Sequence, residues 1–129
     1  MKFPKKKKSE RQLLEKELDK LWSKCVLTRD KYKCQYCRQE GNNPHHIFSR
    51  SNKNTRWDLE NGITLCVSHH TFNSNFSAHL APRNWWIWLE EKRGKKWVDQ
   101  LEQRANISAK GLDLQAIKIY LTQILNKLI

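Results

Sequence analysis

Two pairs of potential metal ligands constrain this chain more than any other feature of its sequence. Cys34 and Cys37 form a Cys-x2-Cys pair, and Cys66 and His69 form a Cys-x2-His pair after 28 intervening residues, 38–65. Ligands at i and i+3 in a tight turn can converge on one tetrahedral ion, and soft thiolates favour zinc over hard divalent metals. The spacing predicts a structural Cys3His zinc site that staples a centre with few apolar residues.

Other uses of cysteine fit this sequence less well. A disulfide needs an oxidising compartment, and the charged start of the chain has no apolar segment behind it, so we expect no secretory signal. A redox Cys-x2-Cys pair would need a strand–helix context that the surrounding residues do not provide. Cys25 lies outside the two pairs, on a helical apolar stripe with Leu18 and Leu21. We interpret Cys25 as a packed core thiol, with a metal role as the alternative.

The positive charge is concentrated at the two ends of the chain. The formal net charge is +12, and residues 1–33, 34–80 and 81–129 carry +7, +1 and +4 of it. Such an excess indicates a polyanionic partner, DNA, held by the flanks; the alternative is a charge that only keeps the protein soluble. We expect one compact domain with a basic tail and N-terminal helix, a zinc-stapled core and a C-terminal helical extension over these three ranges. No apolar run reaches the length of a membrane span.

Hydrophobic periodicity predicts a mostly helical α+β fold. Helices are expected at residues 9–30, from about 67, at 82–94, at 95–105 and from about 113, and short strands at 45–48 and 63–66. Ser9 is the expected N-cap of the first helix, behind a basic tail at residues 1–8. Trp85 and Trp88 lie on one helical face, so we expect a core position for them, with a base-stacking platform as the alternative.

Several histidines remain once the zinc ligands are counted. Neighbours on a helix point about 100° apart, so His69 and His70 cannot both bind one tetrahedral ion. His70 must therefore face elsewhere, as must His45 and His46. These three exceed what a purely structural module needs; the alternative is that they are surface or hydrogen-bonded core histidines.

Four segments in this order resemble the HNH endonucleases of the zinc-ribbon type, and most closely the small phage-encoded members. They are Cys34-Gln-Tyr-Cys37, His45-His46-Ile47, Asn61-Gly-Ile-Thr-Leu-Cys66 and Val67-Ser-His69-His70. The resemblance covers residues 34–70 and implies a small ββα-metal core flanked by N-terminal and C-terminal helices. It also implies a cytoplasmic protein of a bacterial host cell, a monomer or weak dimer, with a phage terminase or packaging protein as a possible partner.

The resemblance also assigns roles to residues. It makes His45 and His70 ligands of a catalytic divalent cation, Mg²⁺ or Mn²⁺ with other divalent ions as the alternative. It makes His46 the general base, and Asn61 the residue that orients the base and braces the loop. Phosphodiester hydrolysis needs a neutral imidazole to accept a proton from water and a cation on the phosphate. The sequence thus favours a metal-dependent DNA endonuclease; the alternative is a non-catalytic zinc-ribbon module that binds DNA.

Two positions depart from the family pattern, and two assignments stay open. Some relatives carry a further histidine one turn after the helix ligand, where this chain has Ser74, and Cys is commoner than His at the position of His69. His79 is either a phosphate contact near the active site or a structural histidine. The candidate phosphate contacts in the inter-strand loop and beyond it, with a solvated loop as the alternative, are Arg50, Lys53, Arg56 and Arg83.

Overall fold

The computed structural model describes residue 3, residues 7–108 and residues 110–129, so the tail lysines Lys2, Lys5 and Lys6 lie outside the described residues. The helices are α1 Glu10–Arg29, α2 Lys53–Arg56, η1 Leu59–Asn61, η2 Ser68–Phe72, α3 Pro82–Arg93, α4 Lys95–Asn106 and α5 Leu114–Leu128, and the strands are β1 Asn43–His46 and β2 Gly62–Leu65. The predicted mostly helical α+β class is confirmed. No helix among the described residues is long and apolar enough to cross a membrane.

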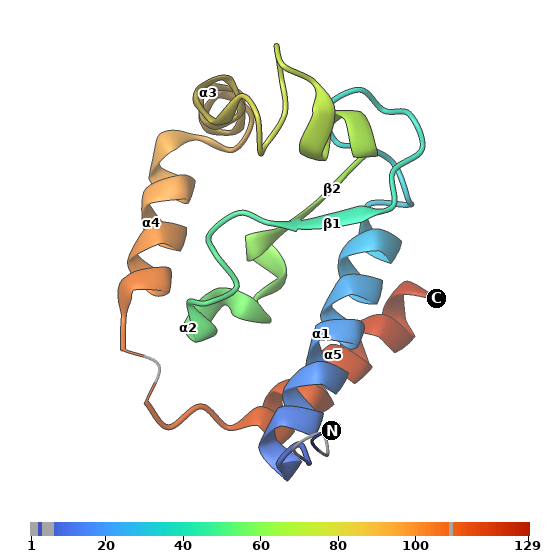
Figure 1. The fold of residues 1–129 in the computed structure, drawn as a ribbon, viewed down its shortest axis with the longest axis vertical. Helices are drawn as coiled ribbons and strands as arrows, with labels where there is room; N and C mark the ends of the chain where they lie inside the picture. Colours follow the sequence, from blue (N-terminus) through green and yellow to red (C-terminus); the bar gives the residue numbers. More distant parts are fainter. Residues whose placement is uncertain (1–2, 4–6, 109) are drawn as a thin grey trace.

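The two strands form an antiparallel hairpin at the centre of the molecule (Figure 1). His45 pairs with Ile63 and His46 with Gly62. The first strand ends at His46, two residues before its predicted end. Beyond it, the Ile47 N–H still donates to the Asn61 carbonyl at 2.9 Å, but the Phe48 N–H donates to the side-chain oxygen of Asn61 at 2.8 Å, and the regular pairing stops there.

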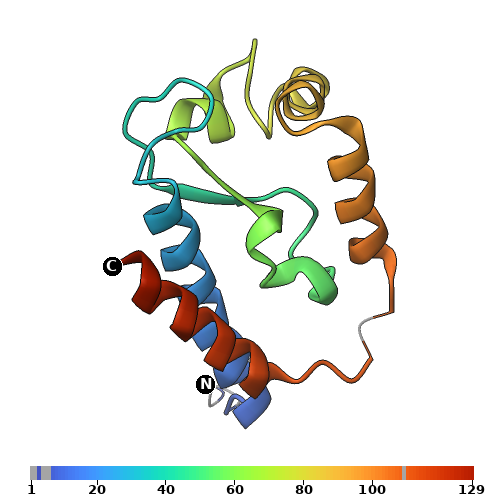
Figure 2. The same ribbon diagram turned by 180° about the vertical axis from the view of Figure 1, so that it is seen from behind.

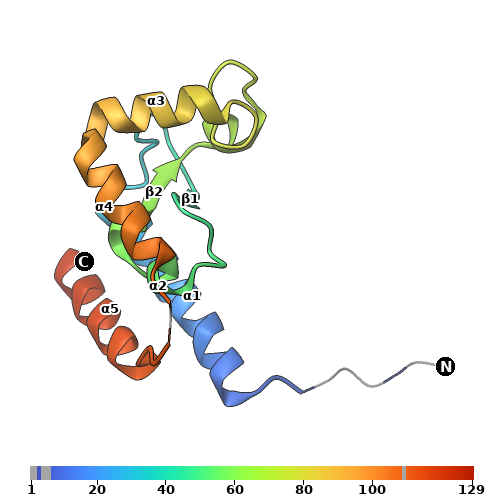
Figure 3. The same ribbon diagram turned by 90° about the vertical axis from the view of Figure 1, so that its left-hand side faces the viewer.

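Side chains of β2 alternate between two hydrophobic clusters. Thr64 faces α1, where its hydroxyl donates to the Val26 carbonyl at 3.5 Å. Ile63 and Leu65 point the other way, into a cluster completed by Trp85 and Leu101 from α3 and α4. The hairpin therefore separates a core shared with α3 and α4 from a core shared with α1 (Figure 3). Because Trp85 is buried in the first cluster, the predicted core position of its indole is confirmed.

Helices α1 and α5 pack side by side, below the hairpin in the view of Figure 2. Ser9 and Gln12 form a reciprocal capping box at the start of α1, which confirms the predicted N-cap. Cys25 is fully buried between the two helices, and its thiol lies 3.4 Å from the carbonyl of Leu121. Its interpretation as a core thiol is confirmed. The N-cap of α5 is Asp113, whose carboxylate accepts the backbone N–H of Ala116.

The helix predicted to begin near residue 67 is only five residues long, the π-helical turn η2. The backbone N–H of Asn73 bonds to the carbonyl of Ser68 at 2.8 Å and closes the turn. The side chain of Asn73 then accepts the backbone N–H groups of Asn75 and Phe76. This local side-chain bonding competes with helix continuation and explains the early end.

Candidate metal centre and histidine triad

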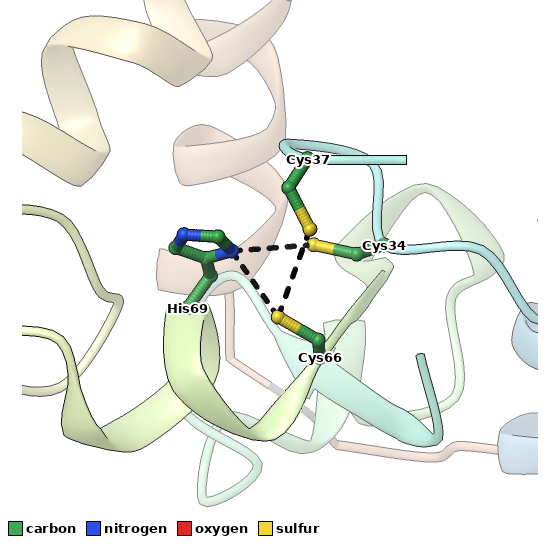
Figure 4. A group of neighbouring side chains, drawn as sticks. All are labelled: Cys34, Cys37, Cys66 and His69. Atoms are coloured by element: carbon green, nitrogen blue, oxygen red, sulfur yellow. Dashed lines mark hydrogen bonds between the residues drawn. The ribbon is translucent and has the colours of Figure 1, made fainter. Parts of the chain in front are cut away.

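The four predicted zinc ligands converge in the structure (Figure 4). Cys66 Sγ lies 3.1 Å from His69 Nδ1, Cys34 Sγ lies 3.9 Å from the same nitrogen, and the sulfurs of Cys37 and Cys66 are 3.8 Å apart. A tetrahedron with Zn–S bonds of 2.3 Å has edges of about 3.8 Å. The donor set and spacing therefore fit a zinc ion, as the sequence predicts.

The thiols of this cluster differ in their pKa. Burial alone would raise the pKa of Cys34, but backbone N–H groups of Cys37 and Cys66 stabilise its thiolate and bring that pKa below its usual value. Burial, opposed by a backbone bond from Gln39 and reinforced by the neighbouring Cys34, raises the pKa of Cys37 to about 11. A thiolate at Cys34 thus disfavours ionisation of the Cys37 thiol. A bound cation would stabilise both thiolates.

A second cluster contains three histidines, which we name the histidine triad: His45, His70 and His79. One ring nitrogen from each of the three histidines lies within 4.8 Å of the ring nitrogens that the other two offer. His45 comes from the penultimate residue of β1, His70 from η2 and His79 from the segment before α3. The Nε2 atoms of His70 and His79 are 3.1 Å apart. The structure thus brings His45 and His70 together, and their role as ligands of a catalytic ion stays a prediction.

The triad is buried at one end and open at the other. His45 is in edge contact with Trp85 at 5.2 Å between ring centroids, whereas His79 is exposed. Burial, reinforced by His70, His79 and His46, lowers the pKa of His45 to about 3. Burial also lowers the pKa of His70, with a smaller effect from His79. Both imidazoles are therefore neutral at pH 7, which is the protonation state that a metal ligand needs.

The structure places His46, the predicted base, on the other face of the strand. Its ring stacks on Trp22 of α1, with centroids 3.8 Å apart and an interplanar angle of 8°. His46 Nε2 lies 2.9 Å from the carbonyl oxygen of Arg56. Because a carbonyl only accepts, Nε2 carries the proton and Nδ1 is the unprotonated nitrogen of the neutral ring. Burial lowers the pKa of His46 despite the opposing effect of that bond.

Asn61 is fully buried, and its side chain holds the inter-strand loop at its start and at its middle. Its amide nitrogen donates to the carbonyl groups of Phe48 and Thr55, each at 3.0 Å, and its oxygen accepts from Phe48. The predicted bracing role is therefore seen in the hydrogen bonds. Asn61 reaches His46 only through the backbone of this loop, because the carbonyl that His46 contacts belongs to Arg56, next to Thr55.

The three loop cations proposed as phosphate contacts are paired with acidic residues of α1. Arg56 makes a two-pronged contact with Asp19 at 2.7 and 3.0 Å. Arg50 lies 3.1 Å from the same carboxylate, and Lys53 lies 3.0 Å from Glu15. Hydrogen bonds from Arg56 and Trp57 outweigh burial and lower the pKa of Asp19. Arg83 is exposed at the start of α3. Contact of these four cations with DNA stays a prediction.

Sequence reasoning left the role of His79 open, and the structure assigns it to the triad. Two backbone bonds place it there: Ala78 N–H donates to the His69 carbonyl at 2.9 Å, and His79 N–H donates to the His70 carbonyl at 3.1 Å. These bonds fold the segment after η2 back over the turn.

Comparisons with models of protein families, with curated proteins and with solved structures found no match. The chemistry of the Cys3His cluster and of the histidine triad is therefore the basis for a functional assignment.

Proposed function

We propose that this protein is a metal-dependent DNA endonuclease with an HNH-type ββα-metal core. The observation that carries the proposal is the histidine triad, which lies beside the complete Cys3His cluster yet shares no ligand with it. A closed four-ligand site is typical of structural zinc, whereas three imidazoles at a site that opens to solvent leave positions for a substrate. The hairpin followed by the short helical turn η2 supplies the ββα order from which the triad projects.

The residues would divide the work as follows. His45, His70 and His79 would hold a divalent cation, and three imidazole nitrogens suit a transition-metal ion such as Mn²⁺ better than Mg²⁺. When bound, such a cation neutralises charge on the scissile phosphate and stabilises the leaving 3′-oxygen. Asn61 keeps the inter-strand loop in place, and the net charge of +12 favours DNA as the substrate. Zinc on the Cys3His cluster would hold β2 and η2 to the turn at Cys34 and Cys37.

His46 is the proposed general base, and two observations support it. Its neutral form has a free Nδ1, because Nε2 is held by the Arg56 carbonyl, and its lowered pKa keeps the ring neutral at physiological pH. A base in this state can accept a proton from water. The His46 ring and the histidine triad lie on opposite faces of β1. A water activated by His46 would therefore have to approach a phosphate at the end of β1 from the face that carries His46.

The second candidate is a zinc-ribbon module that binds DNA without cutting it. The loop cations are already paired with acidic residues, and this pairing and the high net charge are compatible with either function. Cleavage therefore has to be measured. Supercoiled plasmid is incubated with zinc-loaded protein and Mg²⁺ or Mn²⁺, in parallel with His45→Ala, His70→Ala and His79→Ala. We expect metal-dependent nicks or breaks from the wild type and a loss in each variant. A gel shift with no cleavage under any metal would replace the enzyme by the binding module.

Zinc content is the control for these three substitutions. None of the triad residues belongs to the Cys3His cluster, so each variant should keep one zinc per chain. Excess Mn²⁺ should partly rescue His79→Ala, because the other two ligands remain. If His70→Ala strips the zinc and His69→Ala retains it, the roles of the two neighbouring histidines are exchanged.

A further inference from the structure

Three lysines form an exposed stripe on α1, which we name the α1 lysine face: Lys16, Lys20 and Lys24. They are four residues apart, so each is displaced by about 6 Å along the helix and about 40° around it. All three are exposed. Leu18 and Cys25 turn toward α5, and Asp19 turns toward the inter-strand loop. The α1 lysine face is therefore the part of this helix that neither neighbour covers.

Adjoining surface hollows run along this side of α1. One spans Lys7 to Gln12, a second shares Lys8 and Gln12 with it and continues to Asp19, and a third shares Lys16 and Asp19 and continues to Tyr32. We name these adjoining hollows the groove; they extend from the start of α1 to the turn before the Cys3His cluster. The charged residues that line it are Lys7, Lys8, Glu15, Lys16, Asp19, Lys20, Lys24, Arg50 and Arg56.

The two acidic residues of the groove already have partners. Asp19 is bound by Arg50 and Arg56, and Glu15 lies within 4 Å of Lys53 and Arg56. In contrast, the lysines of the α1 lysine face make no ion pair in the described part of the chain. The loop cations are thus neutralised internally, and the unbalanced positive charge of the groove comes from the lysines of α1 and from Lys7 and Lys8 just before it.

We propose that the α1 lysine face is a docking surface for the phosphate backbone of duplex DNA; the choice of DNA rests on the proposed function. The stripe covers about 12 Å, the axial length over which one DNA strand presents about four phosphates. Insertion of α1 into a membrane surface would require a free apolar face on the helix. The apolar stripe of α1 is already packed against α5, which favours a phosphate backbone over a lipid surface.

The test measures binding apart from cleavage. The triple variant Lys16→Gln, Lys20→Gln, Lys24→Gln is compared with the control triple variant Lys96→Gln, Lys110→Gln, Lys127→Gln, which removes the same charge from exposed positions elsewhere. Affinity for a fluorescent duplex of about 20 base pairs, in the length range of a single site, is measured by anisotropy over a salt series. The protein carries zinc, and no Mg²⁺ or Mn²⁺ is added.

Each lost phosphate contact reduces the slope of log K against log salt by about 0.9. We expect the α1 variant to lose up to about 2.7 from this slope and the control variant to keep the wild-type slope. Equal slopes for the two variants would overturn the proposal, even if the wild type cleaves plasmid. A reduced slope in a protein that never cleaves would support this surface and remove the proposed enzyme.

Vesicles that contain phosphatidylserine provide the competing partner. Under the proposal, the wild type prefers the duplex, and the triple variant on α1 changes its vesicle binding no more than the control variant does. If the protein binds these vesicles and not the duplex, and the α1 variant abolishes that binding, a lipid surface replaces DNA and the proposal is wrong. Unchanged zinc content and thermal midpoint in both variants would show that the exposed substitutions left the fold intact.

Discussion

His46 stacks face to face on Trp22, with ring centroids 3.8 Å apart, while the adjacent His45 contacts His70 and His79 across the strand. Two neighbouring histidines thus serve different surroundings, because successive side chains of a strand point to opposite faces. His46 links the hairpin to α1, and His45 completes the histidine triad. This separation allows base and ligand functions to be tested by single substitutions.

We expect His46→Ala to reduce cleavage by about 10²–10⁴-fold, the usual contribution of a positioned general base. Zinc content and affinity for duplex DNA should stay near the wild-type values, because His46 belongs to neither metal cluster. Loss of the ring stack should lower the free energy of unfolding by about 0.5–1.5 kcal/mol. Excess Mn²⁺ should not restore activity. Wild-type cleavage by His46→Ala would remove the base assignment.

The Cys3His cluster was predictable because ligand spacing is a local property. Cys34 and Cys37, like Cys66 and His69, are three residues apart, and a tight turn is enough to bring each pair together. The points where α1 and α3 begin were also predictable, because Ser9 and Pro82 act within the first turn of a helix. Both features depend on neighbours in sequence.

Long-range contacts explain what the sequence did not show. The pairing of Arg56 with Asp19 joins residues 37 positions apart, so no local pattern distinguishes this cation from one that is free to bind phosphate. The face occupied by His46 depends on where α1 packs, and the place of His79 depends on how the segment after η2 folds back. These features are set by tertiary packing.

Cys66→Ser should abolish zinc binding and most of the folded population, because metal binding and folding share one free energy in a small zinc-stapled core. Cys25→Ala is the matched control. It removes a buried thiol between α1 and α5 but no ligand, so it should keep one zinc per chain with a modestly lower thermal midpoint. Zinc content and circular dichroism report the two properties. A Cys66→Ser protein that melts like the wild type without zinc would refute the structural role.

Asp19→Asn should change stability and DNA affinity in opposite directions. The carboxylate binds Arg50, Arg56 and the Trp57 indole, so its neutralisation should cost about 1–3 kcal/mol in urea unfolding. The same change removes a negative charge from the groove on α1 and releases Arg50, so duplex affinity at low salt should rise. Glu91→Gln on α3 is the charge-matched control for affinity. Weaker binding by Asp19→Asn would mean that this carboxylate holds the DNA-contacting residues in position.

Stability without added divalent ions should fall as the pH drops from 8 to 6. The pKa of His45 is about 3 in the folded chain, and the unfolded chain titrates near 6.5, so the unfolded state binds more protons as pH falls through 6.5. This linkage contributes about 0.8 kcal/mol between pH 8 and 6. Urea unfolding of His45→Gln should show a correspondingly shallower dependence, with zinc content checked at each pH. An equal pH dependence in the variant and the wild type would contradict the buried, neutral state of this ring.

Gly62 lies where α1 crosses the hairpin, and the absence of a side chain is required there by space. A Cβ at this position would lie 2.5 Å from Cγ2 of Val26 and 2.6 Å from Cζ2 of Trp22, closer than atoms can approach. We therefore expect Gly62→Ala to destabilise the protein by about 1–3 kcal/mol, the usual cost of overpacking. Because Trp22 also carries the stack on His46, the shift should reduce cleavage along with stability.

A double-mutant cycle with Val26→Ala separates this steric cause from a loss of strand geometry. Val26→Ala removes the nearest clashing methyl group, so Gly62→Ala should cost less in the Val26→Ala background than in the wild type, with a coupling of about 0.5–3 kcal/mol. Additive losses in urea unfolding would show that Val26 does not limit the approach of α1. In that case the rigid indole of Trp22 sets the distance between α1 and the hairpin, and with it the position of His46.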